Sequence, residues 1–115
     1  MIRRRPKVRS GIERAPNREW PKHRQWVRGH ECLVSGCMNR DIEAAHVRTG
    51  GTGGGTGLKP SDWWCVPLCK SHHAMQHQIG EPAFERMHDL DLKKWAWLFA
   101  ERSTDLGMRK AMQCR

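Results

Sequence analysis

The chain has 115 residues, of which 37% are hydrophobic and 29% are charged, and its formal net charge is +9 at pH 7. This size and composition predict one small domain, with too little apolar surface for a multi-domain enzyme. No apolar run approaches the ~20 residues of a transmembrane helix, and no apolar stretch follows the charged N-terminus as in a secretory signal, so we expect a cytoplasmic protein without membrane contact.

The positive charge gathers in the first quarter of the chain. Residues 1–30 hold ten Lys or Arg and two acidic residues, a net +8, whereas residues 31–115 hold eleven and ten, a net +1. Prolines interrupt the first segment and it has no sustained apolar period, so we predict a flexible basic arm over residues 1–24. Such an arm gains affinity for nucleic acid by releasing counterions; the alternative is a solubilising tail. The arm residues expected to contact DNA phosphates are Arg3, Arg4, Arg5 and Lys7.

The cysteine pattern predicts a structural zinc site. Five cysteines, an odd number, in a chain without a secretory signal argue against a disulfide framework. The spacings Cys32-x4-Cys37 and Cys69-x2-His72 are typical of chelating turns, and two such turns complete a tetrahedral Cys3His site for Zn²⁺. We expect Cys65, which lies among apolar neighbours, to be a buried strand residue instead of a ligand.

Histidines concentrate after the second chelating turn. Ser71 predicts a helix N-cap and Gly80 a helix end. On such a helix His73 and His77 stand four residues apart on one face, where they could bind a second ion beside the zinc. His30 could compete as a zinc ligand but falls outside the paired spacing.

Two short predicted strands flank a glycine-rich segment. Residues 42–48 predict a first strand that carries His46, and residues 63–68 predict a second. Six of residues 50–57 are Gly, which suits either close approach to a phosphate or a simple connector. No Walker or dinucleotide-binding pattern is present. The order of strand, glycine segment, strand, chelating turn and helix predicts a ββα unit with a zinc clip at its base.

Two more helices are predicted towards the C-terminus, over residues 82–89 and 91–102. An apolar stripe at helical spacing on the second should pack back on the ββα unit; it comprises Leu92, Trp95, Ala96 and Phe99. Trp97 lies off this stripe, where it either packs or is exposed to a partner. The predicted domain spans residues 25–104, and residues 105–115 are predicted to be a tail.

These features together resemble the HNH endonuclease family, which has a ββα-metal fold. The family pattern places a catalytic His on the first strand and ends with Cys-x2-Cys-His-x3-His on the helix; this chain has Cys69-x2-His72-His73-x3-His77. It is similar in particular to phage and prophage nucleases of the RecA-dependent type, through Ala44-Ala45-His46, the Gly-Thr-Gly run, Lys59-Pro60-Ser61-Asp62, and Pro67-Leu68-Cys69 with the histidines that follow. Many members have a metal ligand directly before the strand His, where this chain has Ala45.

The resemblance implies an α+β fold, namely a zinc-stapled ββα-metal core with C-terminal helices and a basic arm. It also implies a metal-dependent endonuclease that hydrolyses DNA phosphodiester bonds. His46 is then the expected general base, because a neutral imidazole suits that task at cellular pH. His73 and His77 are the expected ligands of a catalytic Mg²⁺ or Mn²⁺, with Asp62, phosphate oxygens or water completing the coordination. Imidazole ligands suit Mn²⁺ better than Mg²⁺, which leaves the identity of the ion open.

Arg48 and Lys59 flank this expected site, either as phosphate contacts or as ordinary solvated charges. The resemblance adds a possible partner, a RecA-like recombinase filament, to the expected partner DNA. Two other functions stay open: a non-catalytic zinc module that binds nucleic acid through its arm, and a protein–protein adaptor that uses a Trp-rich surface. A binding module has no use for three converging imidazoles, so the nuclease prediction requires residues 46, 73 and 77 to meet in one pocket.

Overall fold

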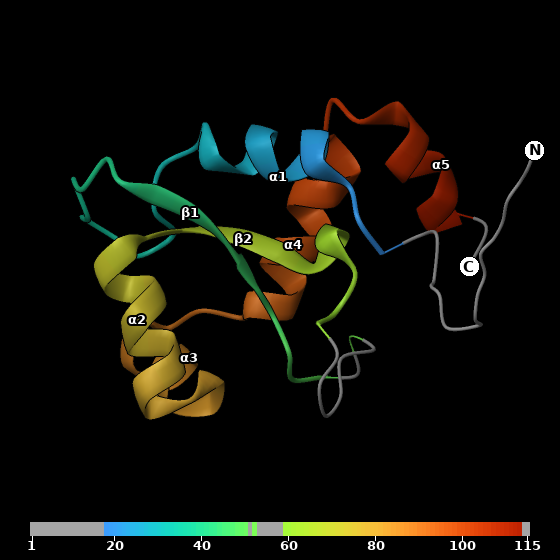
Figure 1. Cartoon of the computed structure of the whole chain (residues 1–115). Helices are drawn as coiled ribbons and strands as arrows, with labels where there is room; N and C mark the ends of the chain where they lie inside the picture. Colours follow the sequence, from blue (N-terminus) through green and yellow to red (C-terminus); the bar gives the residue numbers. More distant parts are fainter. Residues whose placement is uncertain (1–17, 51, 53–58, 114–115) are drawn as a thin grey trace, which may run out of the picture.

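A two-stranded antiparallel sheet forms the centre of the fold, and helices surround it (Figure 1). The computed structural model describes residues 18–50, 52 and 59–113. Within these ranges none of the helices has the length and apolar character of a membrane span. In chain order the elements are α1 (Pro21–Arg28), β1 (Ile42–His46), the 3-10 helix η1 (Asp62–Trp64), β2 (Cys65–Cys69), α2 (Lys70–Ile79), α3 (Glu81–His88), α4 (Leu92–Arg102) and α5 (Leu106–Gln113).

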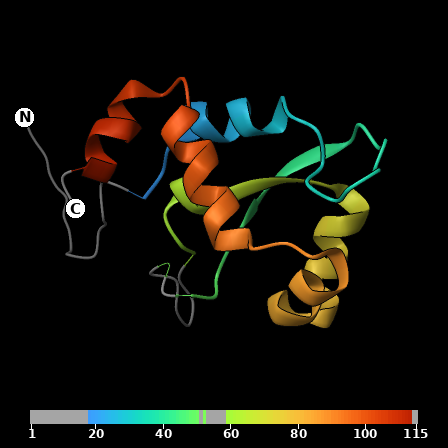
Figure 2. The same cartoon turned by 180° about the vertical axis from the view of Figure 1, so that it is seen from behind.

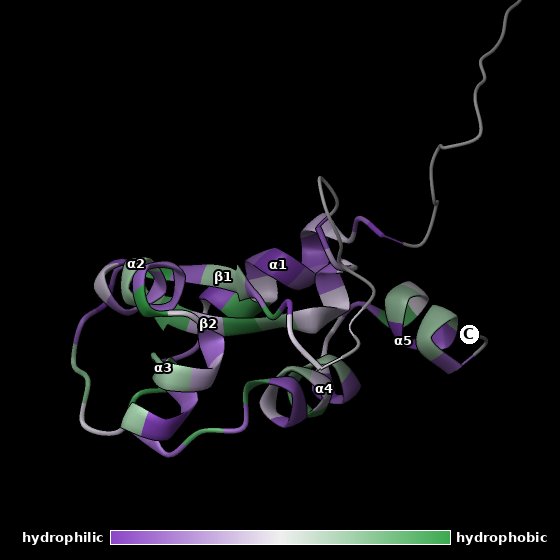
Figure 3. Cartoon of the chain, turned by 90° about the horizontal axis from the view of Figure 1, so that it is seen from below, coloured by the Kyte–Doolittle hydropathy of each residue, from purple (hydrophilic) through white to green (hydrophobic). Residues whose placement is uncertain are grey.

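The core gathers around β2, because this strand is apolar on both faces. All five of its residues are buried, and the register places Ala45 opposite Val66 and His46 opposite Cys65. Helix α4 packs against β2 and α1 against β1. Figure 2 shows α4 in front of the sheet, and in Figure 3 β2 is largely green whereas α1 is largely purple. The fully buried apolar residues include Val47, Val66, Leu68, Phe84, Leu92 and Met108.

The α+β class and the order of β1, β2 and α2 follow the prediction. Strand β2 begins at Cys65, two residues later than predicted, because Asp62–Trp64 forms a 3-10 helix. The prediction of Ser71 as the N-cap of α2 is wrong, since the helix begins directly after Cys69 and uses that residue as its cap. Gly80 ends α2 as predicted, with a positive φ of 86° that favours glycine.

The ends of the described fold differ from the prediction. Residues 18–24, predicted as part of the arm, lead into and begin α1, and α5 occupies most of the predicted tail. Each of these helices buries two side chains, His23 and Val27 in α1 and two methionines in α5. The predicted DNA-contacting residues of the arm, Arg3, Arg4, Arg5 and Lys7, lie outside the described residues, as do residues 51 and 53–58 of the glycine segment.

The predicted apolar stripe of α4 is only partly correct. Leu92 and Ala96 are fully buried, but Trp95 is 38% exposed. Trp97 packs on Trp64, with ring centroids 5.3 Å apart, so packing and not exposure accounts for it. Trp63 and Trp64 are buried whereas Trp95 is exposed, so tryptophan lies both in the core and at the surface, and the adaptor hypothesis stays a prediction.

A buried histidine joins α1 to the end of α4. His23 is fully buried, and its Nδ1 lies 2.8 Å from Oγ of Ser103, the residue that caps α4. Burial lowers the pKa of His23 to about 4, outweighing the nearby carboxylates of Asp105 and Asp62, which raise it. The folded protein therefore keeps this imidazole neutral at pH values where the unfolded chain takes up a proton.

We predict that His23 makes the fold sensitive to mild acid. Between the ordinary pKa of 6.5 and the folded value of about 4 the unfolded chain binds a proton that the folded chain does not. Stability therefore falls as the pH drops through this window. Between about pH 7 and about pH 5 the parent should lose about 2 kcal/mol more unfolding free energy than His23→Gln, as measured by urea titration. His77→Gln, at an exposed histidine, should keep the parent's pH slope; an unchanged slope in His23→Gln contradicts the prediction.

Candidate functional site

The end of β1 and the turn before β2 bring a histidine onto a buried carboxylate. His46 is the last residue of β1, and its Nε2 lies 2.8 Å from Oδ1 of Asp62, the first residue of η1. Asp62 is only 3% exposed. Its other oxygen, Oδ2, accepts the backbone N–H of Trp20 at 2.6 Å and lies 3.3 Å from Nε of Arg24. Three segments that are distant in the sequence therefore meet at one carboxylate.

The surroundings of Asp62 keep its carboxylate ionised. Burial by itself raises its pKa, but the hydrogen bonds from His46 and the Trp20 N–H, together with the Arg24 guanidinium, outweigh burial. The pKa of Asp62 consequently lies below its usual value. An ionised carboxylate only accepts hydrogen bonds, so Nε2 of His46 carries a hydrogen towards Asp62, and in the neutral form of the ring the lone pair lies on Nδ1. The buried carboxylate therefore fixes the orientation of the His46 ring.

A second group of titratable side chains lies between β1 and α2. Nδ1 of His73 donates to Oε1 of Glu43 at 2.6 Å, and Nε2 of His73 lies 3.3 Å from Nε2 of His77. Two imidazole nitrogens that bind one tetrahedral ion lie about 3.4 Å apart. A carboxylate behind a metal-binding histidine fixes its ring in the way that Glu43 contacts His73. The spacing of His73 and His77 therefore suits a divalent ion. Glu43 is a hydrogen-bond partner of His73 that no sequence pattern indicated.

The three imidazoles predicted in one pocket are divided between two groups. Within the described residues no hydrogen bond or ring contact joins His46 to His73 or His77. The side chains of Glu43 and His46, three residues apart on β1, point to opposite faces of the strand. Asp62, predicted to complete the ion site on the helix, pairs with His46 instead. The single predicted pocket is thus replaced by two groups on either side of β1.

The two predicted phosphate contacts flank the glycine segment. The side chains of Arg48 and Lys59 are both exposed. The backbone N–H of Arg48 bonds the Glu81 carboxylate at 2.9 Å, and the carbonyl of Lys59 accepts a hydrogen bond from the Arg18 guanidinium. The backbone is therefore held at both positions while the charges lie at the surface, an arrangement that suits both readings, phosphate contact and solvated charge.

Glu81 ties the segment after His46 to α3. This residue is 7% exposed, and its carboxylate accepts the N–H groups of Arg48 and Thr49 and the Thr49 hydroxyl, the last at 2.7 Å. It also accepts Nε2 of Gln76 at 3.0 Å, and the same amide nitrogen lies 3.2 Å from the His46 carbonyl. The carboxylate therefore fixes the backbone on the C-terminal side of His46, a role without any local signal in the sequence.

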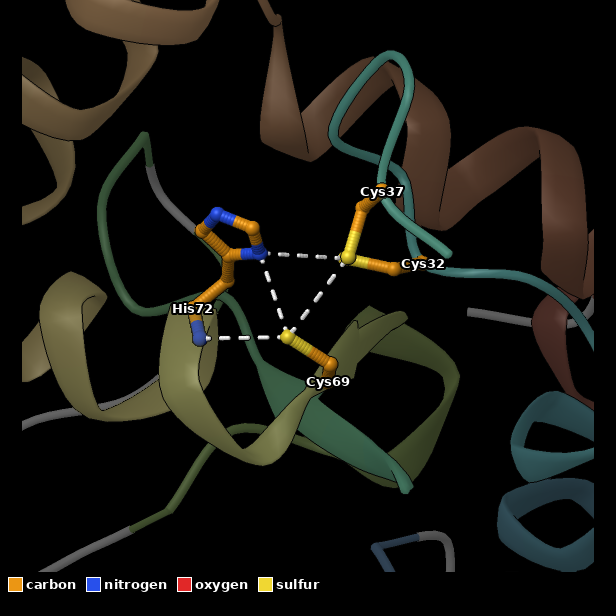
Figure 4. Close-up of side chains that lie close together, drawn as sticks. All are labelled: Cys32, Cys37, Cys69 and His72. Carbon is orange, nitrogen blue, oxygen red and sulfur yellow. Dashed lines mark hydrogen bonds between the residues drawn. The ribbon is translucent and has the colours of Figure 1, made fainter. Parts of the chain in front are cut away.

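Four side chains from two distant turns form a Cys/His cluster, in which the sulfur atoms and a ring nitrogen point toward one another (Figure 4). Sγ of Cys32 and Sγ of Cys69 lie 3.5 and 3.1 Å from Nδ1 of His72, and Sγ of Cys37 lies 3.9 Å from Sγ of Cys69. A tetrahedral zinc ion holds sulfur and nitrogen ligands about 3.5–3.8 Å apart. The cluster could therefore bind a metal such as zinc, and the convergence predicted from the two spacings is confirmed.

The junction of β2 and α2 positions Cys69 and His72 of this cluster. Cys69 is both the last residue of β2 and the N-cap of α2, and its Sγ accepts the backbone N–H of His72 at 3.4 Å. Burial raises the pKa of Cys32 to about 11, whereas a backbone hydrogen bond from Asn39 lowers the pKa of Cys37. Because a metal binds thiolates, binding here releases protons and becomes weaker in acid.

His30 and Cys65 lie outside the Cys/His cluster, as predicted. Nδ1 of His30 lies 2.9 Å from the Trp26 carbonyl. Cys65 is fully buried in β2, and although its sulfur lies within 4.8 Å of the ligand atoms of His46 and Asp62, burial raises its pKa strongly. Cys65 is therefore a neutral thiol in the core and a poor third ligand.

Comparison with known proteins identifies a family without an assigned activity. The family described as "Protein of unknown function (DUF968)" matches residues 4–107. This chain belongs to the DUF968 family. No curated protein and no solved structure matches it. The DUF968 match covers both chelating turns, the sheet and helices α1 to α4, so the Cys/His cluster and both groups beside β1 lie inside the family's domain.

We predict that Glu81 stabilises this DUF968 fold through its hydrogen bonds. Glu81→Gln keeps the shape but replaces one acceptor oxygen with a donor that faces other donors, so it should lower the unfolding free energy by about 3 kcal/mol in urea titration. Glu101→Gln, at an exposed position on α4, is the matched control and should change it by less than about 0.5 kcal/mol. Equal, small effects of the two substitutions would show that the network is not stabilising.

Proposed function

We propose that this DUF968 chain is an endonuclease of the HNH, or ββα-metal, class that hydrolyses DNA phosphodiester bonds. The imidazoles of His46, His73 and His77 do not meet in one pocket, so the proposal does not rest on their convergence. The observation that carries it is instead the His46–Asp62 pair, in which a buried, ionised carboxylate orients a histidine at the end of a strand. The order of strand, strand, Cys-x2-His turn and two-His helix supports the same class. The net charge of +9 favours a polyanionic substrate.

Hydrolysis needs an activated water and relief of the charge that builds up on the phosphate. In the proposed reaction Nδ1 of His46 accepts a proton from water and the resulting hydroxide oxygen bonds to phosphorus. The bond from phosphorus to the 3′ oxygen breaks, and this oxygen takes a proton from solvent to leave as a hydroxyl. Asp62 stabilises the imidazolium that forms. The Arg24 side chain, which lies beside Asp62 and is 32% exposed, is the proposed contact to the same phosphate. Arg24 had no signal in the sequence because it falls in the predicted arm.

The two histidines of α2, His73 and His77, are the proposed ligands of a divalent ion. His73 and His77 would bind it through their Nε2 atoms, with Glu43 fixing the ring of His73. When bound, such an ion supplies Lewis-acid stabilisation of phosphate charge, and two imidazole ligands favour Mn²⁺ over Mg²⁺. Within the described sheet β1 pairs only with β2.

We predict that His46→Ala abolishes DNA cleavage without unfolding the protein. Loss of the general base should reduce the rate by between about 10² and 10⁴-fold, measured by nicking of supercoiled plasmid in Mg²⁺ or Mn²⁺. Asp62→Asn should reduce the rate similarly, because an amide no longer holds the required tautomer. Asp89→Asn, at an exposed position that caps the end of α3, is the matched control and should keep parental cleavage.

The cleavage assay needs a second arm with a RecA-like filament, because dependence on a recombinase partner stays a prediction. Metal content and DNA binding of His46→Ala should equal those of the parent. Cleavage by His46→Ala at the parental rate removes the general-base role. A folded, metal-loaded parent that cuts in neither arm removes the nuclease proposal itself.

One observation favours a second candidate, a metal-stabilised nucleic-acid-binding module without catalysis. His46 and His73 lie in separate groups and each has a carboxylate partner, Asp62 and Glu43, an arrangement that a purely structural role would also explain. Binding without cleavage in both arms of the assay identifies this alternative.

We also propose that the Cys/His cluster holds a structural Zn²⁺. Its support is the donor set and the fit of the four ligand atoms to tetrahedral spacing. The apolar composition is lean for a chain of this size, and a bound metal offsets a small core by joining the turn at Cys32 and Cys37 to the start of α2.

The structural zinc leads to a direct prediction. The purified protein should contain one zinc per chain by elemental analysis, and Cys69→Ser should lose it and more than about 4 kcal/mol of unfolding free energy. Cys114→Ser, at the one cysteine outside the sequence pattern and outside β2, is the control and should keep both metal and stability. Full stability of a metal-free Cys69→Ser protein contradicts the structural role.

A further inference from the structure

A small apolar groove lies between α1 and α4, and it shares no lining residue with the Cys/His cluster or with the two groups beside β1. Its volume is about 120 Å³, and its lining residues are Trp26, His30, Trp95, Leu98, Phe99 and Arg102. Arg24, which contacts Asp62, and Trp26, which lines the groove, are two residues apart on α1 and therefore face different sides of that helix. The groove is thus a separate feature of the surface.

Aromatic rings make up most of the groove, and Phe99 lies at their centre. The ring centroid of Phe99 is 5.2 Å from that of His30, 6.1 Å from that of Trp26 and 6.2 Å from that of Trp95. Trp95 is 38% exposed, although it stands on a helix whose neighbouring Leu92 and Ala96 are fully buried. An indole at the rim of a ring-lined groove offers a flat apolar face to a ligand from solvent.

The two helices that form the groove carry a net positive charge, which favours an anionic ligand. Helices α1 and α4 together carry six Lys or Arg and one acidic residue, a net +5. Residues 1–17 carry six and one, also a net +5. Since the whole chain has +9, all other residues together carry −1. Of the six basic side chains on α1 and α4, Arg102 lines the groove, whereas Arg24 pairs with Asp62 and Lys93 bonds the Gly50 carbonyl. The groove therefore has one guanidinium in its lining and lies between two helices of net positive charge.

We propose that this groove binds the bases of single-stranded DNA, with Trp95 as the stacking platform. An aromatic face beside cationic side chains is the arrangement that holds unpaired nucleotides, because the base stacks while the phosphate meets the charge. In a duplex the base faces are already stacked and paired, so the groove discriminates against double strands. The choice of DNA as the nucleic acid rests on the proposed function. The arguments from aromatic stacking and from positive charge are independent of that function.

The test is direct binding of full-length protein to a fluorescein-labelled strand of about 15 nucleotides, alone or annealed to its complement, by fluorescence anisotropy without added divalent ions. Trp95→Ala should weaken single-strand binding about tenfold and duplex binding less than about twofold. Trp95→Phe should restore single-strand binding to within about threefold of the parent, because it keeps an aromatic face. Met87→Ala, which removes another exposed apolar side chain on α3, is the matched control and should bind as the parent does.

Parental single-strand affinity in a folded Trp95→Ala protein overturns the inference, and so does an equal loss for single strand and duplex. Tighter binding of RNA of the same sequence, with the same dependence on Trp95, overturns the assignment to DNA. A parent that is dimeric in sedimentation, with a monomeric Trp95→Ala of unchanged affinity, shows that a second copy occupies the groove instead. Because binding is measured without cleavage, failure of the groove and failure of the proposed nuclease are separate results.

Discussion

The buried carboxylate of Asp62 is the interaction on which the arrangement around β1 depends. It is shared by a strand end, a backbone N–H before α1 and a guanidinium on α1, and it lies almost entirely out of solvent. A buried charge is tolerated only when several partners compensate the loss of water, so each partner is held as firmly as it holds the carboxylate. The same ionisation that satisfies the fold also selects the tautomer of His46.

The Cys/His cluster bears on stability in a different way. The strand that anchors it is buried throughout, yet the apolar core beyond that strand is small and includes polar side chains such as His23 and Gln76. Cys69 belongs at once to β2, to the first turn of α2 and to the cluster. Loss of the cluster would therefore loosen strand pairing and helix initiation together, so that a metal bound there would couple its binding to folding.

Local spacing predicted the parts of this protein whose signal is local. Cys-x4-Cys and Cys-x2-His identified the cluster, and a strand carrying His46 followed from a short alternating run. Long-range partners had no such signal. Glu43 and Glu81 are ordinary acidic residues in the sequence, and their roles depend on which helix packs beside β1. Helix α1 was not predicted from the sequence. One of its two buried side chains is a histidine, where a search for apolar periodicity expects a hydrocarbon side chain.

Gly80 has one further consequence, because it ends α2 and also caps the start of α3. A connection of one residue between two helices cannot absorb a change in length. Each residue inserted there turns the following helix by about 100° about its axis, which would swing Glu81 away from the backbone it holds after His46. We therefore expect members of this family to differ in length elsewhere. The number of residues between the histidines of α2 and Glu81 should be constant, because an insertion or deletion there would misplace the Glu81 carboxylate.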